Sequence, residues 1–315
     1  MSNQSVEFSC PYMNRRRFLR DVALWSAGAA VAAPLFRIGP RAEGAVASPT
    51  LAVGKGTDYE ALVAKVLEPL GGLAPFVKKG ARVVVKPNIA WDSKPEQGGN
   101  THPLLVKAMV KLCLAAGASK VMVFDRSCNK CQLTYVSSGI QAAVESLKDP
   151  RATCAFVDDR KFVPVKIQKG KATTQWEFYK DALDADSYIN MPVAKHHVLA
   201  KLTIGVKNIM GIVGGKRGDL HKSLAQSVVD LNTVVKPKLT VVDATRILLR
   251  NGPRGGKLED VKELHTLIAS PDVVAADAYA TTLFDKAPNE LETTQLAAAA
   301  GLGVMDLNKV KIVKV

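Results

Sequence analysis

The chain has 315 residues, of which 47% are hydrophobic and 23% are charged, as is typical of an ordinary soluble globular protein. Its formal net charge is +14, yet aromatic residues make up only 6% of the chain. No nucleic-acid-binding motif is present either, so these features exclude nucleic acid as an expected partner.

Residues 1–47 have the layout of a bacterial twin-arginine export signal. The pair Arg15 and Arg16 precedes Phe-Leu and a further basic residue, and a short apolar run rich in Ala and Gly follows at 22–36. A small-x-small site at 45–47 is suited to a signal peptidase. We therefore expect export to the periplasm with the twin-arginine translocase as a partner, and no stable membrane span after cleavage. An uncleaved basic anchor is the alternative.

The rest of the chain, 48–315, is long enough for a single α/β domain. Hydrophobic spacing predicts helices at 59–67, 103–116, 140–147, 222–234, 273–284 and 290–300. Strands are expected at 81–85, 120–124, 153–157, 163–167, 187–191, 239–242, 266–269 and 310–315. This alternation predicts an α/β fold with a mostly parallel or mixed sheet and helices on both faces.

Polar side chains follow most of the predicted strands. Ligands of open parallel sheets bind beyond the carboxyl ends of the strands, so we expect several of these side chains to meet in one crevice. The alternative is that strands end in polar residues simply because loops lie in water. The residues concerned are Lys86, Asn88, Asp125, Asn190, Asp243, Thr245, Arg246 and Asp272.

A lysine and two histidines stand together after the predicted strand that ends at Asn190. We predict Lys195, His196 and His197 as catalytic candidates, because both residue types transfer protons. Adjacent histidines point in different directions, so they rarely bind one metal as a pair, although one could join His102 or His221 as a ligand. An exposed histidine pair without a role is the alternative.

Most of the excess positive charge lies between Asn190 and Lys257, where twelve Lys or Arg face three Asp, a net of +9. Within it, closely spaced glycines at 211–218 would let backbone N–H groups approach an anion. The stretch matches neither standard nucleotide-binding pattern, and a solvated surface or a packing turn is the alternative. The predicted cofactor-binding residues are Lys86, Asn88, Asn190, Lys207, Asn208, Lys216, Arg217 and Arg246.

The cysteines offer one pair with functional spacing, Cys128 and Cys131. Such a pair can hold zinc or part of an iron–sulfur cluster, or form a disulfide, which is what we expect in an oxidising periplasm. With His102 and His221, this pair completes the candidate metal ligands. Cys113 and Cys154 have apolar neighbours and are expected in the core.

Several of these motifs occur in one order that resembles the family called domain of unknown function 362, over about 80–303. That family is mostly uncharacterised, and some members are fused to ferredoxin modules whereas others carry twin-arginine signals. The resemblance implies a redox association, although this chain lacks the ferredoxin cysteine pattern. The segments that carry it are 84–88, 101–103, 190–197, 207–211 and 243–246.

The sequence thus favours an exported protein that binds an anionic cofactor or small molecule, with a metal as a further option, in a redox-related role with a partner protein. The cofactor is not identified by the sequence. One alternative is a non-redox enzyme that acts on an anionic substrate with a Lys or His base. Another is a non-catalytic protein that delivers a cofactor.

Overall fold

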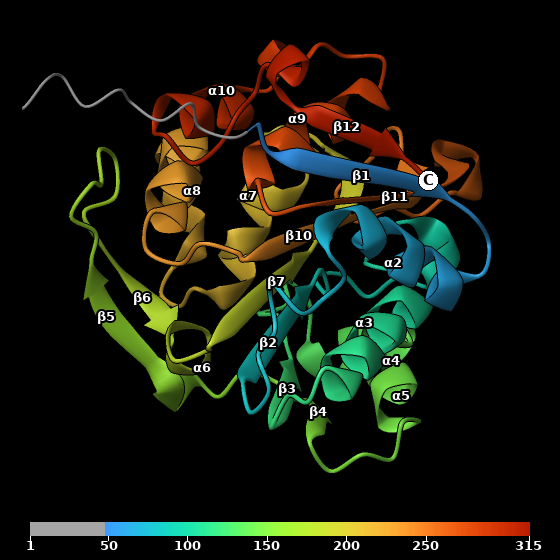
Figure 1. The fold of residues 1–315 in the computed structure, drawn as a ribbon. Helices are drawn as coiled ribbons and strands as arrows, with labels where there is room; N and C mark the ends of the chain where they lie inside the picture. Colours follow the sequence, from blue (N-terminus) through green and yellow to red (C-terminus); the bar gives the residue numbers. More distant parts are fainter. Residues whose placement is uncertain (1–47) are drawn as a thin grey trace, which may run out of the picture. The chain divides into compact units, whose positions relative to one another are not determined.

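A ten-stranded sheet runs through the part of the chain that the computed structural model describes, residues 48–315 (Figure 1). The export signal predicted at 1–47 lies outside the described residues. In sheet order the strands are β12 (Lys311–Lys314), β1 (Thr50–Lys55), β11 (Val261–Ser270), β10 (Leu239–Leu248), β7 (Ser187–Met191), β2 (Arg82–Pro87), β3 (Lys120–Val123) and β4 (Ala152–Cys154). Two further strands, β8 (Val193–His197) and β9 (Lys201–Thr203), extend from β10.

The sheet is mixed. The five neighbouring strands β10, β7, β2, β3 and β4 are all parallel to one another, and β8 is also parallel to β10. Strand β11 is antiparallel to both β10 and β1. The α/β fold with a mostly parallel or mixed sheet is therefore confirmed. Because β11 runs antiparallel to β10, the carboxyl ends of these two strands point in opposite directions.

Helices cover both faces of this sheet (Figure 1). Since side chains alternate along a strand, Val83 and Val85 of β2 pack into one core and Val84 into the other. The first core includes residues of α2 (Tyr59–Leu67), α3 (Pro103–Ala115), α4 (Cys131–Ser137) and α5 (Ile140–Glu145). The opposite face carries α7 (Gly205–Asn208), α8 (Leu224–Asn232), α9 (Val273–Thr282) and α10 (Glu292–Ala299).

The structure departs from the expected elements in several places, among them the helices α4, α6 (Lys180–Leu183) and α7, which were not expected. The strand expected at 163–167 is β5 (Phe162–Lys166), which pairs with β6 (Gln175–Tyr179) in a separate hairpin that precedes α6. Strands β1, β6, β8 and β9 were not expected from the sequence. The helix expected to begin at 222 begins instead at Leu224, as α8, and the residues before it, Arg217–Ser223, form a 3₁₀ helix.

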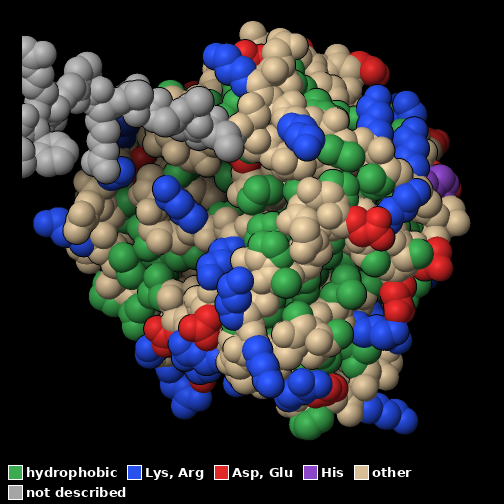
Figure 2. All heavy atoms as spheres, viewed as in Figure 1, with side chains coloured by type: hydrophobic (Ala, Val, Ile, Leu, Met, Phe, Trp, Pro, Cys, Tyr) green, Lys and Arg blue, Asp and Glu red, His purple; other side chains and the backbone are tan. Residues whose placement is uncertain are grey.

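Charge on the surface is not gathered in one region of the face that Figure 2 shows. Lys and Arg side chains are spread over this face with Asp and Glu among them (Figure 2). Among residues 48–315, no helix is long and apolar enough to cross a membrane.

Candidate functional site

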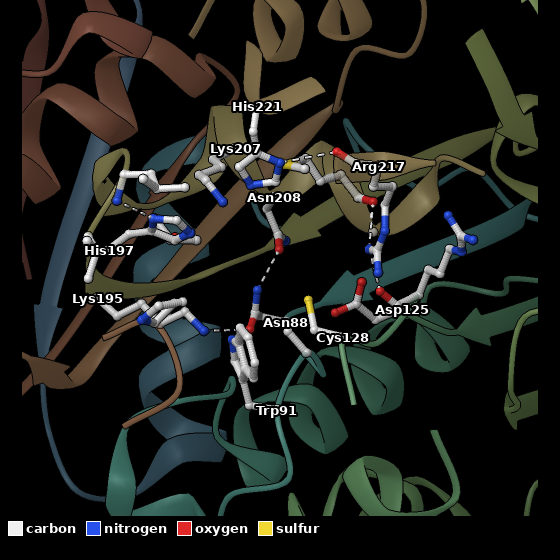
Figure 3. A pocket seen from close by; sticks show the side chains of 18 of the residues that line it. Asn88, Trp91, Asp125, Cys128, Lys195, His197, Lys207, Asn208, Arg217 and His221 are labelled. Atoms are coloured by element: carbon white, nitrogen blue, oxygen red, sulfur yellow. Dashed lines mark hydrogen bonds between the residues drawn. The ribbon is translucent and has the colours of Figure 1, made fainter. Parts of the chain in front are cut away.

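A cavity of about 520 Å³ opens beyond the carboxyl ends of β2 and β3, where β8, β9 and α7 also meet (Figure 3). Its lining is rich in cations, because four different elements each bring a lysine or arginine to it. The polar lining residues are Lys86, Asn88, Asp125, Arg126, Cys128, Lys195, His197, Thr203, Lys207, Asn208, Arg217 and His221. We call this cavity the cationic pocket.

A buried ion pair lies at one side of the cationic pocket. Lys86 Nζ is 3.0 Å from Asp125 Oδ1, and both side chains are at most 2% exposed. Lys86 Nζ also donates to Asn208 Oδ1 at 2.6 Å, and Asp125 Oδ2 accepts the backbone N–H of Ile89 at 2.6 Å. Burial lowers the pKa of Lys86, and the charge of Asp125 opposes that shift. This pair fixes the ends of β2 and β3 to each other.

Three asparagine side chains connect this pair to the rest of the site. Asn208 Nδ2 donates to Asn190 Oδ1 at 2.8 Å, and Asn88 Nδ2 donates to Asn208 Oδ1 at 3.2 Å. Asn88 Oδ1 in turn accepts Lys195 Nζ at 3.0 Å (Figure 3). Because each of these hydrogen bonds joins two different segments of the chain, the network holds the lysines in fixed positions.

Lys195 is the second buried lysine, only 1% exposed. Burial is the main cause that lowers its pKa, to about 7, and the neighbouring Lys207 adds to the shift. Its Nζ donates to Asn88 Oδ1 and to the carbonyl of Gly99. Lys195 therefore places an amine of nearly neutral pKa at the cavity.

Lys207 differs from the other two lysines, because its ammonium group has no hydrogen-bond or ion-pair partner among residues 48–315. The side chain is partly buried and lines the cationic pocket (Figure 3). Burial lowers its pKa to about 8, and the charges of Arg217 and Lys86 act in the same direction. An unpaired ammonium in a cavity is a site that an anion would complete.

The short helix α7 holds Lys207 and Asn208 in place. Asp277 of α9 accepts the backbone N–H groups of Gly205 at 2.7 Å and Val206 at 2.9 Å. A helix of four residues cannot satisfy these groups internally, so the carboxylate fixes the start of α7. Burial raises the pKa of Asp277 to about 7.

Thr203 completes the polar lining from β9. The residue lines the cationic pocket, and its Oγ1 is buried and has no hydrogen-bond partner within the described chain. Thr203 is the cross-strand partner of Lys195, so both side chains stand on the same face of the β8–β9 pair. Sequence reasoning missed Thr203, because the short strand that carries it gave no recognisable pattern.

Of the predicted catalytic residues, Lys195 and His197 line the cationic pocket and His196 does not. His197 Nδ1 accepts the backbone N–H groups of Leu199 and Ala200, both at 3.2 Å. Burial, with the charge of Lys207, lowers the pKa of His197 to about 3, so this ring is a neutral acceptor that shapes the turn. His196 Nδ1 instead accepts the N–H of Gly252 at 3.1 Å.

Some of the predicted cofactor-binding residues line the cationic pocket and others lie outside it. Lys86, Asn88, Lys207, Asn208 and Arg217 line the cationic pocket. Asn190 is buried behind Asn208, Lys216 is exposed and Arg246 is partly buried away from the lining.

Arg217 lines the pocket, but its guanidinium is already occupied by backbone carbonyls. It donates to the carbonyl oxygens of Arg126 at 2.6 Å, Ser127 at 2.8 Å and Met210 at 3.2 Å. Arg126 likewise donates to Val213 and Gly215, and lies over the ring of Phe162. Both arginines therefore tie loops together at the edge of the pocket.

The glycines at 211–218 serve packing more than anion binding. The N–H groups of Gly214 and Gly215 are both taken by Glu177, at 2.9 Å each. A Cβ on Gly211 would lie 1.7 Å from Asp125 Oδ1, so this glycine lets the chain pass directly over the buried ion pair. The expected phosphate loop is thus replaced by a close-packed segment.

The four candidate metal ligands do not form one centre. Among residues 48–315, no group of three or more His, Cys, Asp or Glu side chains is placed to hold a metal ion. His102 caps α3 by accepting the N–H of Leu104 at 3.2 Å, and burial lowers its pKa to about 3. His221 and Cys128 line the cationic pocket, whereas Cys131 begins α4 outside its lining.

The expected disulfide is not formed either, since Cys128 and Cys131 are free thiols. The prediction for the other two cysteines is confirmed: Cys113 and Cys154 are buried, and burial raises the pKa of each thiol to about 12.

Two of the strand-end residues serve the fold instead of the pocket. Asp243 accepts the N–H of His102 at 2.8 Å and the hydroxyl of Thr245 at 2.6 Å. Asp272 caps α9 by accepting the N–H groups of Val274 and Ala275. Asp272 is not among the strand-end residues that meet at the pocket, because β11 is antiparallel to β10 and its carboxyl end therefore lies at the opposite end of the strands.

The lowered lysine pKa values predict a stability that rises in alkaline solution. Between pH 7 and 10 the unfolded chain binds more protons than the folded chain at Lys195, so the free energy of unfolding should increase with pH. Lys195→Met should reduce that slope by up to about 1.4 kcal/mol per pH unit. Urea denaturation at pH 7, 8 and 9 measures this slope. Equal slopes in the wild-type protein and in Lys195→Met would contradict a lowered pKa of Lys195.

Fold and site together define an α/β protein with a lysine-rich pocket at the strand ends. The chain belongs to the family described as domain of unknown function (DUF362), whose model matches residues 83–282. A thylakoid-associated protein of Synechocystis sp. is 30% identical over 253 residues, which cover 76% of this chain and 73% of that protein.

Two solved structures are similar at a lower level. A protein from Thermotoga maritima has 13% sequence identity and a TM-score of 0.43, over 76% of this chain and 58% of its own length. The lactate racemase apoprotein from Thermoanaerobacterium thermosaccharolyticum has 12% identity and a TM-score of 0.42, over 70% and 54%. This chain thus matches little more than half of each protein.

Proposed function

We propose that the protein binds a small anionic molecule or cofactor, a carboxylate or a phosphate, in the cationic pocket. The observation that carries the proposal is the Lys207 ammonium, which lines the cavity without a partner among residues 48–315. The buried hydroxyl of Thr203 is a second unsatisfied donor in the same lining. An anion would accept from both groups and would offset the cost of burying positive charge.

Calorimetric titration with inorganic phosphate and small dicarboxylates at pH 7 tests this proposal. Lys207→Met should weaken binding at least tenfold, or about 1.4 kcal/mol, because the charged donor is lost. Lys216→Met removes the same charge from an exposed position outside the pocket and is the matched control. Equal losses in the two variants would mean that the anion binds elsewhere.

We also propose that the chain acts outside the cytoplasm, after export by the twin-arginine translocase. The support is the Arg15–Arg16 pair with the apolar run and small-x-small site behind it. Arg15→Lys with Arg16→Lys should keep the chain uncleaved in the cytoplasm of a host that has this pathway. Cell fractionation measures the outcome, and undiminished periplasmic protein would contradict it.

A redox role with a partner protein remains a prediction from the family resemblance. A specific observation favours a second candidate, a non-redox enzyme that acts on an anionic substrate. That observation is the amine of Lys195, whose pKa of about 7 suits proton transfer or nucleophilic attack near neutral pH.

A further inference from the structure

We infer that the ligand of the cationic pocket carries an aldehyde or ketone carbonyl beside its anionic group, and that Lys195 condenses with this carbonyl to form an imine. This inference rests on the proposed anion binding and names the class of ligand: a small oxoacid or an aldehyde phosphate. Three features of the described residues support it.

The first feature is the hydrogen bonding of Lys195. A neutral amine has two N–H groups and one lone pair, whereas an ammonium has three N–H groups. Lys195 Nζ has two acceptors, Asn88 Oδ1 and the carbonyl of Gly99. A neutral amine can donate to both acceptors and still keep its lone pair for a ligand in the cavity that Lys195 lines. This is the state in which a lysine is a nucleophile.

The second feature is the division of roles among the lysines. The nitrogen of Lys86 is engaged by Asp125 at 3.0 Å and by Asn208 at 2.6 Å, so it does not supply a free amine. Lys207 is unpaired within the described chain and exerts the largest charge effect on Lys195. An anion bound to Lys207 would therefore hold the rest of the molecule near the Lys195 amine.

The third feature is the unsatisfied hydroxyl of Thr203. It lies on the same face as its cross-strand partner Lys195 and lines the same cavity. A carbonyl under attack by Lys195 develops negative charge on its oxygen, and a hydroxyl donor stabilises that charge. For a ligand that carries both groups, we therefore assign the single O–H of Thr203 to the carbonyl oxygen and leave the anionic group to Lys207, whereas a simple oxyanion such as phosphate would accept from both donors.

The step balances without an oxidant or a reductant. The Lys195 nitrogen forms a bond to the carbonyl carbon, and the carbonyl oxygen takes up a proton to give a carbinolamine. Loss of that hydroxyl with a further proton as water leaves the C=N bond. The amine gives up both of its protons, so one carbonyl compound and one amine yield one imine and one water.

Reductive trapping tests the inference on the wild-type chain. The protein is incubated at pH 7 with glyoxylate or pyruvate and sodium cyanoborohydride, which reduces imines to stable amines, and is then mapped by peptide mass spectrometry. At this pH ordinary lysines, with a pKa near 10.4, have a neutral fraction about a thousandfold smaller than that of Lys195. Among the lysines we expect the main adduct on Lys195, because the anionic group of the ligand keeps Lys207 charged, and we expect none with glycolate or lactate, which lack the carbonyl. The N-terminal amine, with a pKa of about 8, is expected to react as well and is counted separately.

Three variants and one competitor test whether the adduct forms at Lys195 inside the cationic pocket. Lys195→Met should abolish the adduct, Thr203→Val should slow its formation at least tenfold without a change in thermal unfolding, and Lys216→Met should leave it unchanged. Added phosphate should protect Lys195 by occupying Lys207. If phosphate still binds but the adducts are spread over exposed lysines and Lys195 is unmodified, the proposed imine at Lys195 is wrong. The proposed anion binding would then still stand. Failure of both trapping and phosphate binding would overturn the two proposals together.

Discussion

Replacing Asp125 by asparagine is expected to lower the free energy of unfolding by about 3–5 kcal/mol, because the change leaves the Lys86 ammonium buried without its countercharge. Both side chains are at most 2% exposed, so water would replace the lost partner only in part. The neutral amide would also be a weaker partner for the backbone N–H of Ile89, which Asp125 Oδ2 accepts at 2.6 Å. Urea denaturation at pH 7 measures the loss.

Two controls show whether the buried pair is the cause. The double variant Lys86→Met with Asp125→Leu removes both charges and should recover part of the lost stability, since no unpaired charge is left, although the backbone N–H of Ile89 still lacks its acceptor. Asp158→Asn breaks the exposed pair with Arg160 and should have little effect. A stability of Asp125→Asn close to that of Asp158→Asn would contradict the account of the ion pair.

Gly211→Ala should be strongly destabilising although it adds only one methyl group. The added Cβ would lie 1.7 Å from Asp125 Oδ1 and 2.4 Å from Lys86 Cε, so the ion pair and the segment above it would have to separate. Overpacking of this kind costs about 1–3 kcal/mol, and disruption of the ion pair adds to it. Phosphate affinity should fall as well, because Gly211 lines the cationic pocket.

Gly256→Ala is the matched control for Gly211→Ala. A Cβ at Gly256 meets no atom of the described chain within 4 Å, so the free energy of unfolding and the phosphate affinity should both stay at their wild-type values. Thermal unfolding and calorimetry on the two variants measure the contrast. A stable Gly211→Ala with unchanged phosphate affinity would mean that the segment can move away from the ion pair at no cost.

Much of the fold follows from local sequence pattern. The β-branched run that forms β2 and the apolar spacing of α3 are decided by neighbours in the chain, and both were predicted. Strands β8 and β9 were missed because Lys195, His196 and Lys201 do not resemble a strand. Their extended form depends on pairing with each other and with β10, which lies far away in the sequence.

The site could be predicted only in part for the same reason. Parallel neighbours bring the ends of β2 and β3 together, so the position of Lys86 near Asp125 could be anticipated from strand order. The antiparallel direction of β11 could not, and it removes Asp272 from the site. Lys207 and Lys216 lie in one basic stretch, and only the packing of α7 distinguishes the cavity-lining residue from the exposed one.

The most direct test of anion binding in the cationic pocket is an anomalous diffraction map from crystals of residues 48–315 soaked in sodium selenate. Selenate has the shape and charge of a doubly charged oxyanion, and selenium identifies its position without ambiguity. We expect a selenium peak in the cavity, with selenate oxygens within hydrogen-bond distance of Lys207 Nζ and Thr203 Oγ1. Selenium peaks confined to exposed lysines and arginines, with the cavity free of selenate, would contradict it.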